Sequence, residues 1–340
     1  MAEQSTPSSE PRRDGAHELT DGAEMNTVVP RAQDGRVPQR WAWASDIHLN
    51  FVSGRRRLAF CRSVCRVADG LIVTGDIGES TDLERHLRAL AHAIPVVAYV
   101  LGNHDLYDSD AASVHALAER LTDEIPNLWW LDASGILELS STTALIGVGG
   151  WADARWGRWE VAADMNDYRY IADFRVLGED QRMWREVMER WANRDAQLAE
   201  QLLTAAASRY SRVVMATHVP PFWESAQNYR GRPMSTVLYP HYCSRIMGQA
   251  IVRVMQQYPD TRLGVLCGHT HGATEHSPLP NVTVYTAYAE YGDPRIQPQV
   301  VDVASPRLLE PSRRESHVPP GPRQVQTIDR DYTFDELGWE

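Results

Sequence analysis

The 340-residue sequence contains no lysine, so all 34 of its basic side chains are arginine. This absence excludes every mechanism that needs a Schiff-base lysine or the lysine of a phosphate-binding loop. Cysteine is also scarce, and no CxxC spacing occurs among the four present, Cys61, Cys65, Cys243 and Cys267. The pattern indicates neither a disulfide framework nor a four-thiolate zinc site, and a reducing compartment suits it best.

Long hydrophobic runs are missing too. None approaches the roughly 18 to 20 residues that a membrane-spanning helix needs, and residues 1–40 lack the basic start and apolar stretch of a secretory signal. We therefore expect a soluble cytoplasmic protein without a membrane partner. Acids outnumber bases by 45 to 34, and the formal charge of −11 repels nucleic acid, so we expect no nucleic-acid polymer as partner. The oligomeric state stays open.

The composition divides the chain into three parts. Residues 1–40 are rich in Ser, Pro, Gly, Asp and Glu and cannot bury enough apolar surface to offset their ordering entropy, so we expect a disordered lead. Residues 41–303 form the folded domain. Residues 304–340 form a Pro-rich tail whose last residues include side chains able to dock on the body, namely Tyr332, Phe334, Leu337 and Trp339.

Within the domain, short apolar runs alternate with helical patterns, which is typical of an α/β fold. The predicted helices span 56–68, 82–93 and 243–257. Thr81 and Glu84 are predicted to form a capping box at the start of the second of these helices. The predicted strands span 41–45, 71–75, 95–102, 143–149, 212–217, 263–267 and 282–287.

Residues 151–194 depart from this alternation, because five tryptophans are concentrated there among many charged residues. We interpret this segment as an insertion into the domain. In its second half the apolar residues follow helical spacing, which predicts an amphipathic helix facing the core; they are Trp184, Val187, Met188, Trp191, Leu198 and Leu202. Its arginines and tryptophans also suit a cover over a phosphate-bearing ligand, with the stretch Met165–Arg169 as a candidate.

Metal-binding residue types repeatedly follow the predicted strands: Asp46 and His48, Asp76, Asn103 to Asp105, His218, and His269 with His271. Ligands of open α/β sheets bind beyond the carboxyl ends of the strands, so these side chains should meet at one edge. Each motif alone is typical of a turn, a cap or a surface histidine, but the ordered set of five indicates a site. The number of candidate nitrogen and oxygen ligands is larger than the four that one tetrahedral ion needs. They predict two divalent ions, Mn, Fe or Zn, with Asp76 as the bridge.

The blocks Asp46-x-His48, Gly75-Asp76, Gly102-Asn103-His104-Asp105, His218 and Gly268-His269-Thr270-His271 resemble the five ordered motifs of the calcineurin-like metallophosphoesterases. The resemblance covers residues 41 to about 290. It implies a four-layer α-β-β-α sandwich of two mixed β-sheets flanked by helices, with a binuclear metal centre at the sheet edge. The second block continues as Ile77-Gly78-Glu79 and lacks the Asp-Arg-Gly of the serine/threonine phosphatases, which disfavours protein phosphatase activity.

The resemblance also implies a role for each residue. One ion would be held by Asp46, His48, Asp76 and His271. The other would be held by Asp76, Asn103, His218 and His269. His104 would lie beside the ions and stabilise the phosphoryl group or protonate the leaving oxygen. Asp105 would either orient His104 or a ligand, or cap the local backbone.

We therefore expect a hydrolase that cleaves a small phosphomonoester, phosphodiester or nucleotide by direct attack of a hydroxide bridging the two ions. No Gly-x-Ser-x-Gly or Cys-His signature indicates a protein nucleophile. Two alternatives remain open: a metal hydrolase of an amide or carboxylic ester on the same scaffold, and a non-catalytic interaction module.

Several other polar residues are expected outside the site. For His241 and Tyr242, at a helix start, we expect a surface or capping position. For Cys267 we expect a buried position in its strand. The remaining histidines are expected to be solvated or at the surface: His86, His92, His115 and His276.

Overall fold

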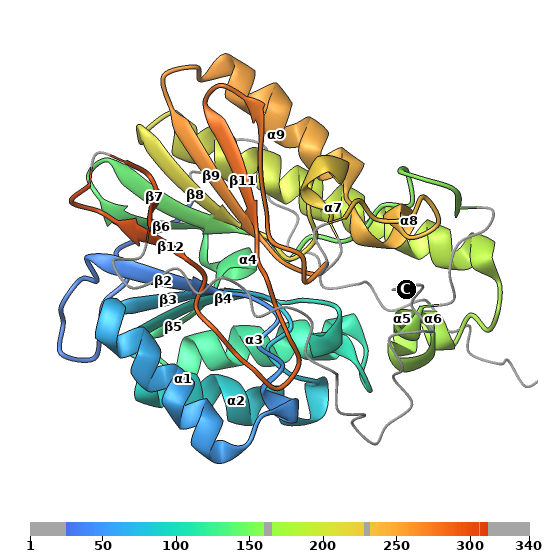
Figure 1. Cartoon of the computed structure of the whole chain (residues 1–340), viewed down its shortest axis with the longest axis horizontal. Helices are drawn as coiled ribbons and strands as arrows, with labels where there is room; N and C mark the ends of the chain where they lie inside the picture. Colours follow the sequence, from blue (N-terminus) through green and yellow to red (C-terminus); the bar gives the residue numbers. More distant parts are fainter. Residues whose placement is uncertain (1–24, 160–164, 228–231, 306, 312–340) are drawn as a thin grey trace, which may run out of the picture.

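The computed structural model describes residues 25–159, 165–227, 232–305 and 307–311. These residues form two mixed β-sheets that pack face to face between layers of helices (Figure 1). The four-layer α-β-β-α sandwich implied by the sequence resemblance is confirmed.

The six-stranded sheet has a parallel centre and an antiparallel edge. Strands β3 and β4 are buried along their whole length and are apolar except for Thr74 and the Tyr99 hydroxyl, as is typical of parallel strands covered on both faces. In spatial order the strands are β13 (Glu310–Pro311), β12 (Gln299–Asp302), β2 (Arg40–Ala44), β3 (Gly70–Thr74), β4 (Val96–Val100) and β5 (Leu128–Trp130).

The seven-stranded sheet is also mixed, with a parallel run from β7 to β11. The order is β1 (Thr27–Val28), β6 (Ile136–Ser140), β7 (Thr143–Gly147), β8 (Arg212–Ala216), β9 (Arg262–Cys267), β11 (Val282–Thr286) and β10 (Thr274–Leu279). Alternate residues of the strands face the other sheet, so Trp41 and Trp43 pack with Leu145, Val214 and Leu266 in the central core.

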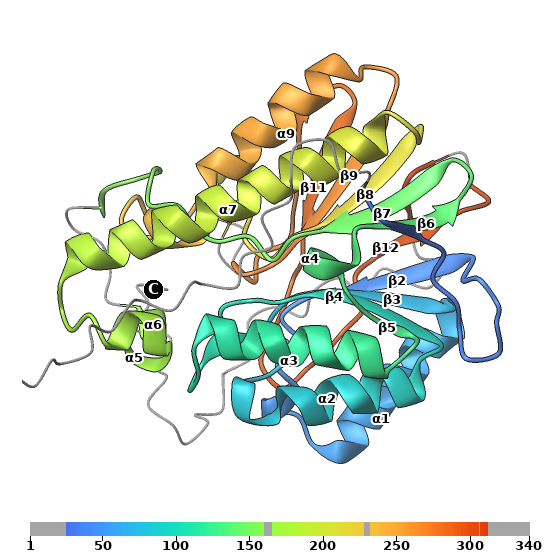
Figure 2. The same cartoon turned by 180° about the vertical axis from the view of Figure 1, so that it is seen from behind.

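Helices cover the two outer faces. Figures 1 and 2 show α1 (Gly54–Val67), α2 (Ser80–Ala93) and α3 (Ala111–Glu124) on the six-stranded sheet, and α7 (Gln181–Ala207) and α9 (Arg245–Gln257) on the seven-stranded one. Leu83, Leu87 and Leu90 of α2 recur at helical spacing and are fully buried, which is the amphipathic pattern of a surface helix. Short helices complete the fold: α4 (Leu131–Ser134), α5 (Asn166–Tyr170), α6 (Ala172–Arg175) and α8 (Tyr239–Tyr242).

The strands and helices predicted from the sequence are present, with ends that differ by a few residues. Helix α2 begins at Ser80, so its capping box is made by Glu79 and Asp82 instead of Thr81 and Glu84. Order also begins before residue 41: β1 pairs in parallel with β6, contrary to our expectation for that part of the lead. Residues 1–24 and 312–340, with the proposed aromatic anchor, lie outside the described residues.

The insertion contains α5, α6 and the first half of α7. The amphipathic helix predicted there is confirmed, because Trp184, Val187, Met188 and Trp191 are buried. Trp191 packs edge-to-face on Trp151, with 4.9 Å between the ring centroids. In the described part of the chain, no helix is long and apolar enough to cross a membrane.

Candidate metal centre

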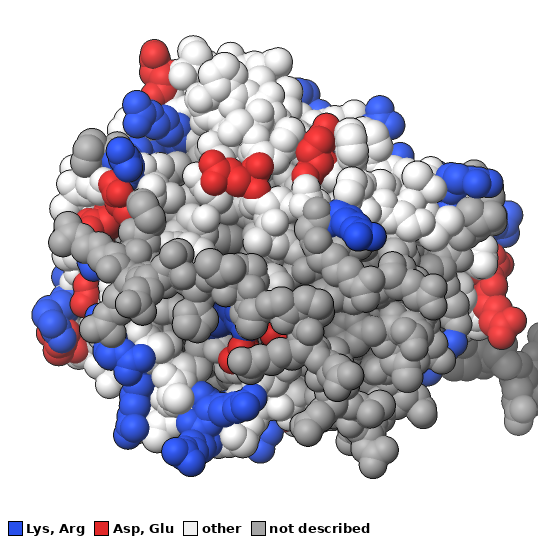
Figure 3. Space-filling model, viewed as in Figure 1, with Lys and Arg blue, Asp and Glu red and all other residues white. Residues whose placement is uncertain are grey.

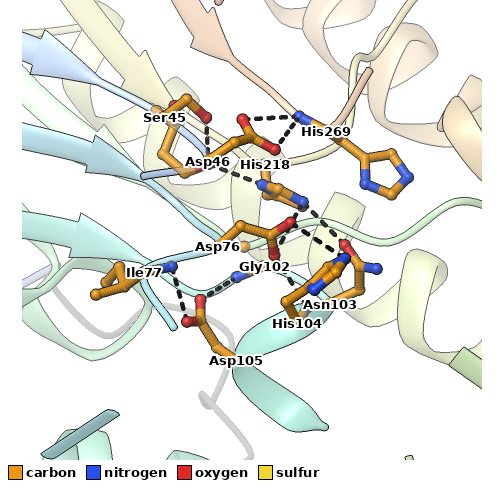
Figure 4. A network of polar contacts seen from close by, with 12 residues as sticks. Ser45, Asp46, Asp76, Ile77, Gly102, Asn103, His104, Asp105, His218 and His269 are labelled. Atoms are coloured by element: carbon orange, nitrogen blue, oxygen red, sulfur yellow. Dashed lines mark hydrogen bonds and ion pairs between the residues drawn. The ribbon is translucent and has the colours of Figure 1, made fainter. Parts of the chain in front are cut away.

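The loops that follow five strands meet at one edge of the sandwich. Asp46 and His48 follow β2, Asp76 follows β3, and His218 follows β8. Backbone bonds tie the loops together: the Asp46 N–H donates to the Gly75 carbonyl at 3.0 Å, and the His48 N–H to the Asp76 carbonyl at 3.0 Å. Both sheets therefore contribute side chains to the same place, as Figure 4 shows.

Five of the seven predicted ligands come together in buried groups whose ligand atoms lie within 4.8 Å of one another. The groups that could hold an ion are Asp46 with His48 and His271, His48 with Asp76 and His104, and Asp46 with Asp76 and His218. The Nε2 of His271 lies 3.4 Å from Oδ1 of Asp46. Asp76 faces both ways, with Oδ1 3.5 Å from Nε2 of His218 and Oδ2 3.8 Å from Nε2 of His48.

The remaining two predicted ligands adjoin these groups. The Oδ1 of Asn103 lies 3.1 Å from Nε2 of His218. The His269 ring lies 4.9 Å from that of His218, and its Nε2 is 3.0 Å from the His241 carbonyl oxygen. Because a carbonyl only accepts, this contact places the His269 proton on Nε2 and leaves the lone pair on Nδ1.

The backbone is strained at the centre. In the described part of the chain, seven residues other than glycine have positive φ, and five of them are predicted ligands: Asp46 (50°), His48 (37°), Asp76 (52°), His269 (69°) and His271 (56°). Left-handed conformations are costly for side chains of this kind and cluster at functional sites. The strain gathers on the ligand residues rather than on the turns of the surface.

Two glycines of the motifs are required by close packing. A Cβ built on Gly102 would overlap Oδ1 and the backbone nitrogen of Asp76. A Cβ on Gly268 would overlap the Ser45 hydroxyl and Oδ2 of Asp46. The glycines let the backbone approach the carboxylates closely.

The electrostatics of the cluster favour a cation. Burial, and then the charges of Asp46 and Asp105, raise the pKa of Asp76 well above its ordinary value. Burial, and then the charges of His104 and His271, lower the pKa of His48 well below its ordinary value. For Asp46, burial acts to raise the pKa, but the hydrogen bond and charge of His271 lower it overall. A cation would stabilise the ionised carboxylates and the neutral imidazoles together.

Buried ring nitrogens without a hydrogen-bond partner show whether the residues of the centre suit a metal ion. Both ring nitrogens of His48 are buried and have no hydrogen-bond partner, which is rare for buried polar atoms. The surrounding donors are imidazole nitrogens and carboxylate or amide oxygens, which suit Mn, Fe and Zn. The residues present therefore fit divalent metal ions.

His104 lies beside the ligands without being enclosed by them. Its backbone N–H donates to Oδ1 of Asp76 at 2.9 Å, and its ring packs against Tyr107 at 4.3 Å between centroids. Its side chain is 14% exposed, whereas that of His48 is 1% exposed. Burial, and then the charges of His271 and His218, lower the pKa of His104 to about 3, so the imidazole is neutral at pH 7.

Asp105 connects two of the loops. Its carboxylate accepts the N–H groups of Ile77 at 2.9 Å, Gly78 at 3.0 Å and Gly102 at 2.8 Å. Burial raises its pKa to about 7, although the backbone donors act to lower it. The side chain thus fixes the backbone next to Asp76 and Asn103.

Two expectations about histidines outside the site are wrong. His241 and Tyr242 are buried, because α8 packs against the centre: the His241 carbonyl bonds His269, and the Tyr242 ring lies 4.5 Å from the His269 ring. His86 is buried on α2, where its Nε2 lies 3.1 Å from Asp82. The others are exposed (His92) or half-buried (His115 and His276), and Cys267 is buried as expected.

Sequence reasoning also assigned no role at the ligands to two residues that contact them, Asp167 and Tyr291. Asp167, from the insertion, accepts hydrogen bonds at Oδ1 from Nδ2 of Asn103 at 2.8 Å and from the Tyr107 hydroxyl at 2.7 Å. The Tyr291 ring stacks on His48 at 4.4 Å between centroids. No local signal separates Asp167 from the other acids of the insertion, although the stretch Met165–Arg169 was a candidate cover.

Comparisons with known proteins found one matching family model and several similar solved structures. A family model described as calcineurin-like phosphoesterase matches residues 40–273. Among solved structures, a phosphopantetheinyl hydrolase from Mycobacterium tuberculosis aligns with a TM-score of 0.54 and 12% identity, covering 76% of this chain and 95% of that chain. A dimetal phosphatase from Danio rerio aligns with a TM-score of 0.46 and 13% identity, covering 74% and 88%. No curated protein matches the sequence.

Proposed function

The chain belongs to the calcineurin-like phosphoesterase family, and from this membership we propose that it is a metal-dependent hydrolase acting on a small phosphomonoester, phosphodiester or nucleotide. The observation that carries the proposal is the convergence of Asp46, His48, Asp76, His218 and His271 in buried groups. A strained, buried cluster of carboxylates and unpartnered imidazole nitrogens is costly to fold unless it binds cations.

The proposal includes two divalent ions. Asp46, His48, Asp76 and His271 would hold one, and Asp76, Asn103, His218 and His269 the other. The orientation of Asp76 supports this division, since one oxygen faces His48 and the other faces His218. When bound, two such ions supply Lewis-acid stabilisation of phosphate oxygens and lower the pKa of a coordinated water.

His104 would assist the leaving group. Its partly exposed ring is held by Tyr107 and by the backbone bond to Asp76, so it can face a bound ester. As a neutral imidazole it presents an N–H to the phosphoryl or leaving oxygen. A negative phosphoryl group beside the ring would raise its pKa and favour the protonated form that donates to the leaving oxygen.

The surface beside the centre supports an anionic substrate. Helix α1 carries four exposed arginines, Arg55, Arg56, Arg62 and Arg66, and the half-buried Arg57, and none of the five forms an ion pair within the described part of the chain. Figure 3 shows basic side chains gathered where α1 lies in Figure 1. Its first turn adjoins the centre, because Arg56 donates to the Gly292 carbonyl at 2.7 Å, next to Tyr291. A local positive field attracts phosphate esters to a chain of formal charge −11.

Cytoplasmic residence and the absence of a nucleic-acid partner are parts of the same proposal. All four cysteines are free, which suits a reducing compartment. The net negative charge opposes long polyanions.

The test compares the rates at which the Mn²⁺-loaded protein cleaves phosphate esters, a carboxylic ester and an amide. Metal-free protein is reloaded with Mn²⁺ and assayed on p-nitrophenyl phosphate, bis-p-nitrophenyl phosphate, p-nitrophenyl acetate and an aryl amide. We expect Mn²⁺-dependent release from a phosphate ester that exceeds release from the acetate and the amide. Cleavage confined to the acetate or amide would establish the non-phosphate alternative. Absence of bound metal and of all turnover would contradict the proposal and leave a non-catalytic module.

A further inference from the structure

We propose that helix α5 of the insertion positions the ligands of one of the two ions, with Asp167 as its main positioning residue. This inference rests on the proposed function, because it concerns the ion assigned to Asn103, His218 and His269. It adds an element outside the five motifs, and it divides the centre into a half that depends on the insertion and a half that does not.

The first contact fixes the side-chain amide of Asn103. Asp167 is buried, and its Oδ1 lies 2.8 Å from Nδ2 of Asn103. An ionised carboxylate only accepts, so it must face the NH₂ group of the amide. The Oδ1 of Asn103 then faces the other way, toward His218 at 3.1 Å. Asp167 therefore selects the amide orientation that presents an oxygen to the ion.

The same carboxylate oxygen also holds Tyr107. The Tyr107 hydroxyl donates to Oδ1 of Asp167 at 2.7 Å, and its ring packs on His104. Asp167 is not itself in any of the ligand groups found among the described residues. Its contacts are those of a residue that acts through Asn103 and Tyr107, not those of a ligand.

The second contact comes from the next residue of α5. The Tyr168 hydroxyl lies 2.9 Å from Nδ1 of His241, and the His241 carbonyl accepts from Nε2 of His269 at 3.0 Å. The Tyr168 ring stacks on Trp184 of α7, with centroids 3.9 Å apart and planes 7° apart, which anchors α5 on the long helix. Tyr168 thus supports the backbone that orients His269.

The contact of Asp167 with Asn103 and the contact of Tyr168 with His241 lead to the same half of the centre. Asn103 and His269 belong to one proposed ion, and a hollow of about 10 Å³, with room for about one water, lies between them and Asp167, Tyr168 and His241. In the described part of the chain, no hydrogen bond or ion pair joins the insertion to Asp46, His48 or His271. The ion proposed for Asp46, His48 and His271 should therefore be independent of α5.

The experiment measures ion binding, not turnover. Metal-free wild type, Asp167→Ala and Asp167→Asn are titrated with Mn²⁺, and bound ions are counted and followed by electron paramagnetic resonance. In Asp167→Ala we expect the second ion, the one assigned to Asn103, His218 and His269, to bind about 10- to 100-fold more weakly. The first ion, assigned to Asp46, His48 and His271, should keep its affinity. The signal of coupled Mn²⁺ pairs should be replaced by that of isolated Mn²⁺. Asp167→Asn keeps an acceptor oxygen without the charge, so we expect a smaller, several-fold weakening of the second ion.

The matched control is Asp153→Asn, which changes another buried carboxylate of the insertion. The Asp153 carboxylate accepts the N–H of Ile246 at 2.8 Å and of Arg155 at 3.1 Å and pairs with the Arg155 guanidinium at 3.3 Å. None of these partners is a proposed ligand, so this variant should bind both ions as wild type does.

The outcomes separate the two proposals. Wild type that binds fewer than two ions contradicts the binuclear proposed function. Wild type that binds two ions, together with unchanged affinity for both in Asp167→Ala, overturns the role of α5 alone. If circular dichroism shows that Asp167→Ala is unfolded, Asp167→Asn decides, and wild-type affinity for the second ion in that variant overturns the inference. Equal weakening of the two ions, or weakening in Asp153→Asn, also contradicts it.

Discussion

The Nδ1 of His218 lies 2.8 Å from the carbonyl oxygen of Thr74, and this contact joins the two sheets at the metal centre. His218 follows β8 of the seven-stranded sheet, whereas Thr74 ends β3 of the six-stranded sheet. Since a carbonyl only accepts, the imidazole proton is on Nδ1, and Nε2 is left to face Asp76. One side chain thus links the packing of the sandwich to the orientation of a ligand.

Removal of this side chain should disrupt the centre. In His218→Ala we expect loss of at least one bound ion and a decrease in kcat/KM of at least about 100-fold, because Lewis-acid stabilisation of the phosphate is worth several kcal/mol. The measurement combines metal analysis with hydrolysis of an aryl phosphate. His92→Ala is the control, since His92 is exposed on α2, and it should match wild type. Full metal content and activity in His218→Ala would rule out His218 as a ligand.

Gly102 should tolerate no side chain. In Gly102→Ala the new methyl group would displace Asp76, whose Oδ1 and backbone nitrogen occupy its place, so we expect at least about ten-fold weaker metal binding. The measurement is Mn²⁺ titration of the folded variant. Gly54→Ala is the matched control: its Cβ would meet only an Arg57 guanidinium nitrogen, at 3.9 Å, and metal binding should be unchanged. Wild-type affinity in Gly102→Ala would show that the loop can shift without cost.

The sequence predicted what depends on local pattern and on strand order. Fully buried strands such as Val96–Val100 can be predicted because they are apolar runs in the sequence. The polar residues that follow these strands predict the site, because parallel strands end at one edge of the sheet. Strands β1 and β13 have only two residues each and exist through pairing with β6 and β12. No local pattern indicates such pairing.

The residues that hold the ligands in place could not be predicted from the sequence, because their contacts also join distant parts of the chain. His241 lies in the short helix Tyr239–Tyr242, and its burial is decided by packing against His269 from a block distant in sequence. Asp167 contacts Asn103 across 64 residues. Long-range contacts of this kind depend on tertiary structure, while propensity and spacing describe neighbours along the chain.

His104 is predicted to act on the leaving group. In His104→Ala we expect both ions to remain bound and kcat to fall by about 10²- to 10⁴-fold, the usual contribution of general acid catalysis. The fall should be larger for an alkyl phosphate than for p-nitrophenyl phosphate, because a nitrophenolate departs without a proton. Rates for the two esters are measured on wild type and variant with equal metal content. An equal loss for both esters would contradict proton donation by His104 and favour stabilisation of the phosphoryl group.

Acid should destabilise the fold through histidines whose pKa is lowered in the folded chain, and the half-buried His115 on α3 allows a test away from the metal centre. Burial, and then the charge of Arg194, lower its pKa from 6.5 to about 4. In the unfolded chain His115 is protonated below about pH 6.5, whereas in the folded chain it is protonated only below about pH 4. The free energy of unfolding therefore falls as the pH is lowered from about 6.5 to about 4. At pH 5 the loss from His115 is about 1 to 2 kcal/mol relative to pH 7.5.

His115→Phe isolates this contribution, because phenylalanine keeps the aromatic contact with Trp130, whose ring lies 5.2 Å away, and cannot be protonated. Urea unfolding of wild type and variant at pH 7.5 and pH 5 gives the four free energies. We expect a smaller decrease in His115→Phe than in wild type, while His92→Gln, which changes an exposed histidine, should show the wild-type decrease. The buried histidines of the metal centre contribute equally to all three proteins, so the difference between variants belongs to His115. Equal decreases in wild type and His115→Phe would mean that His115 is protonated as readily in the folded chain as in the unfolded one.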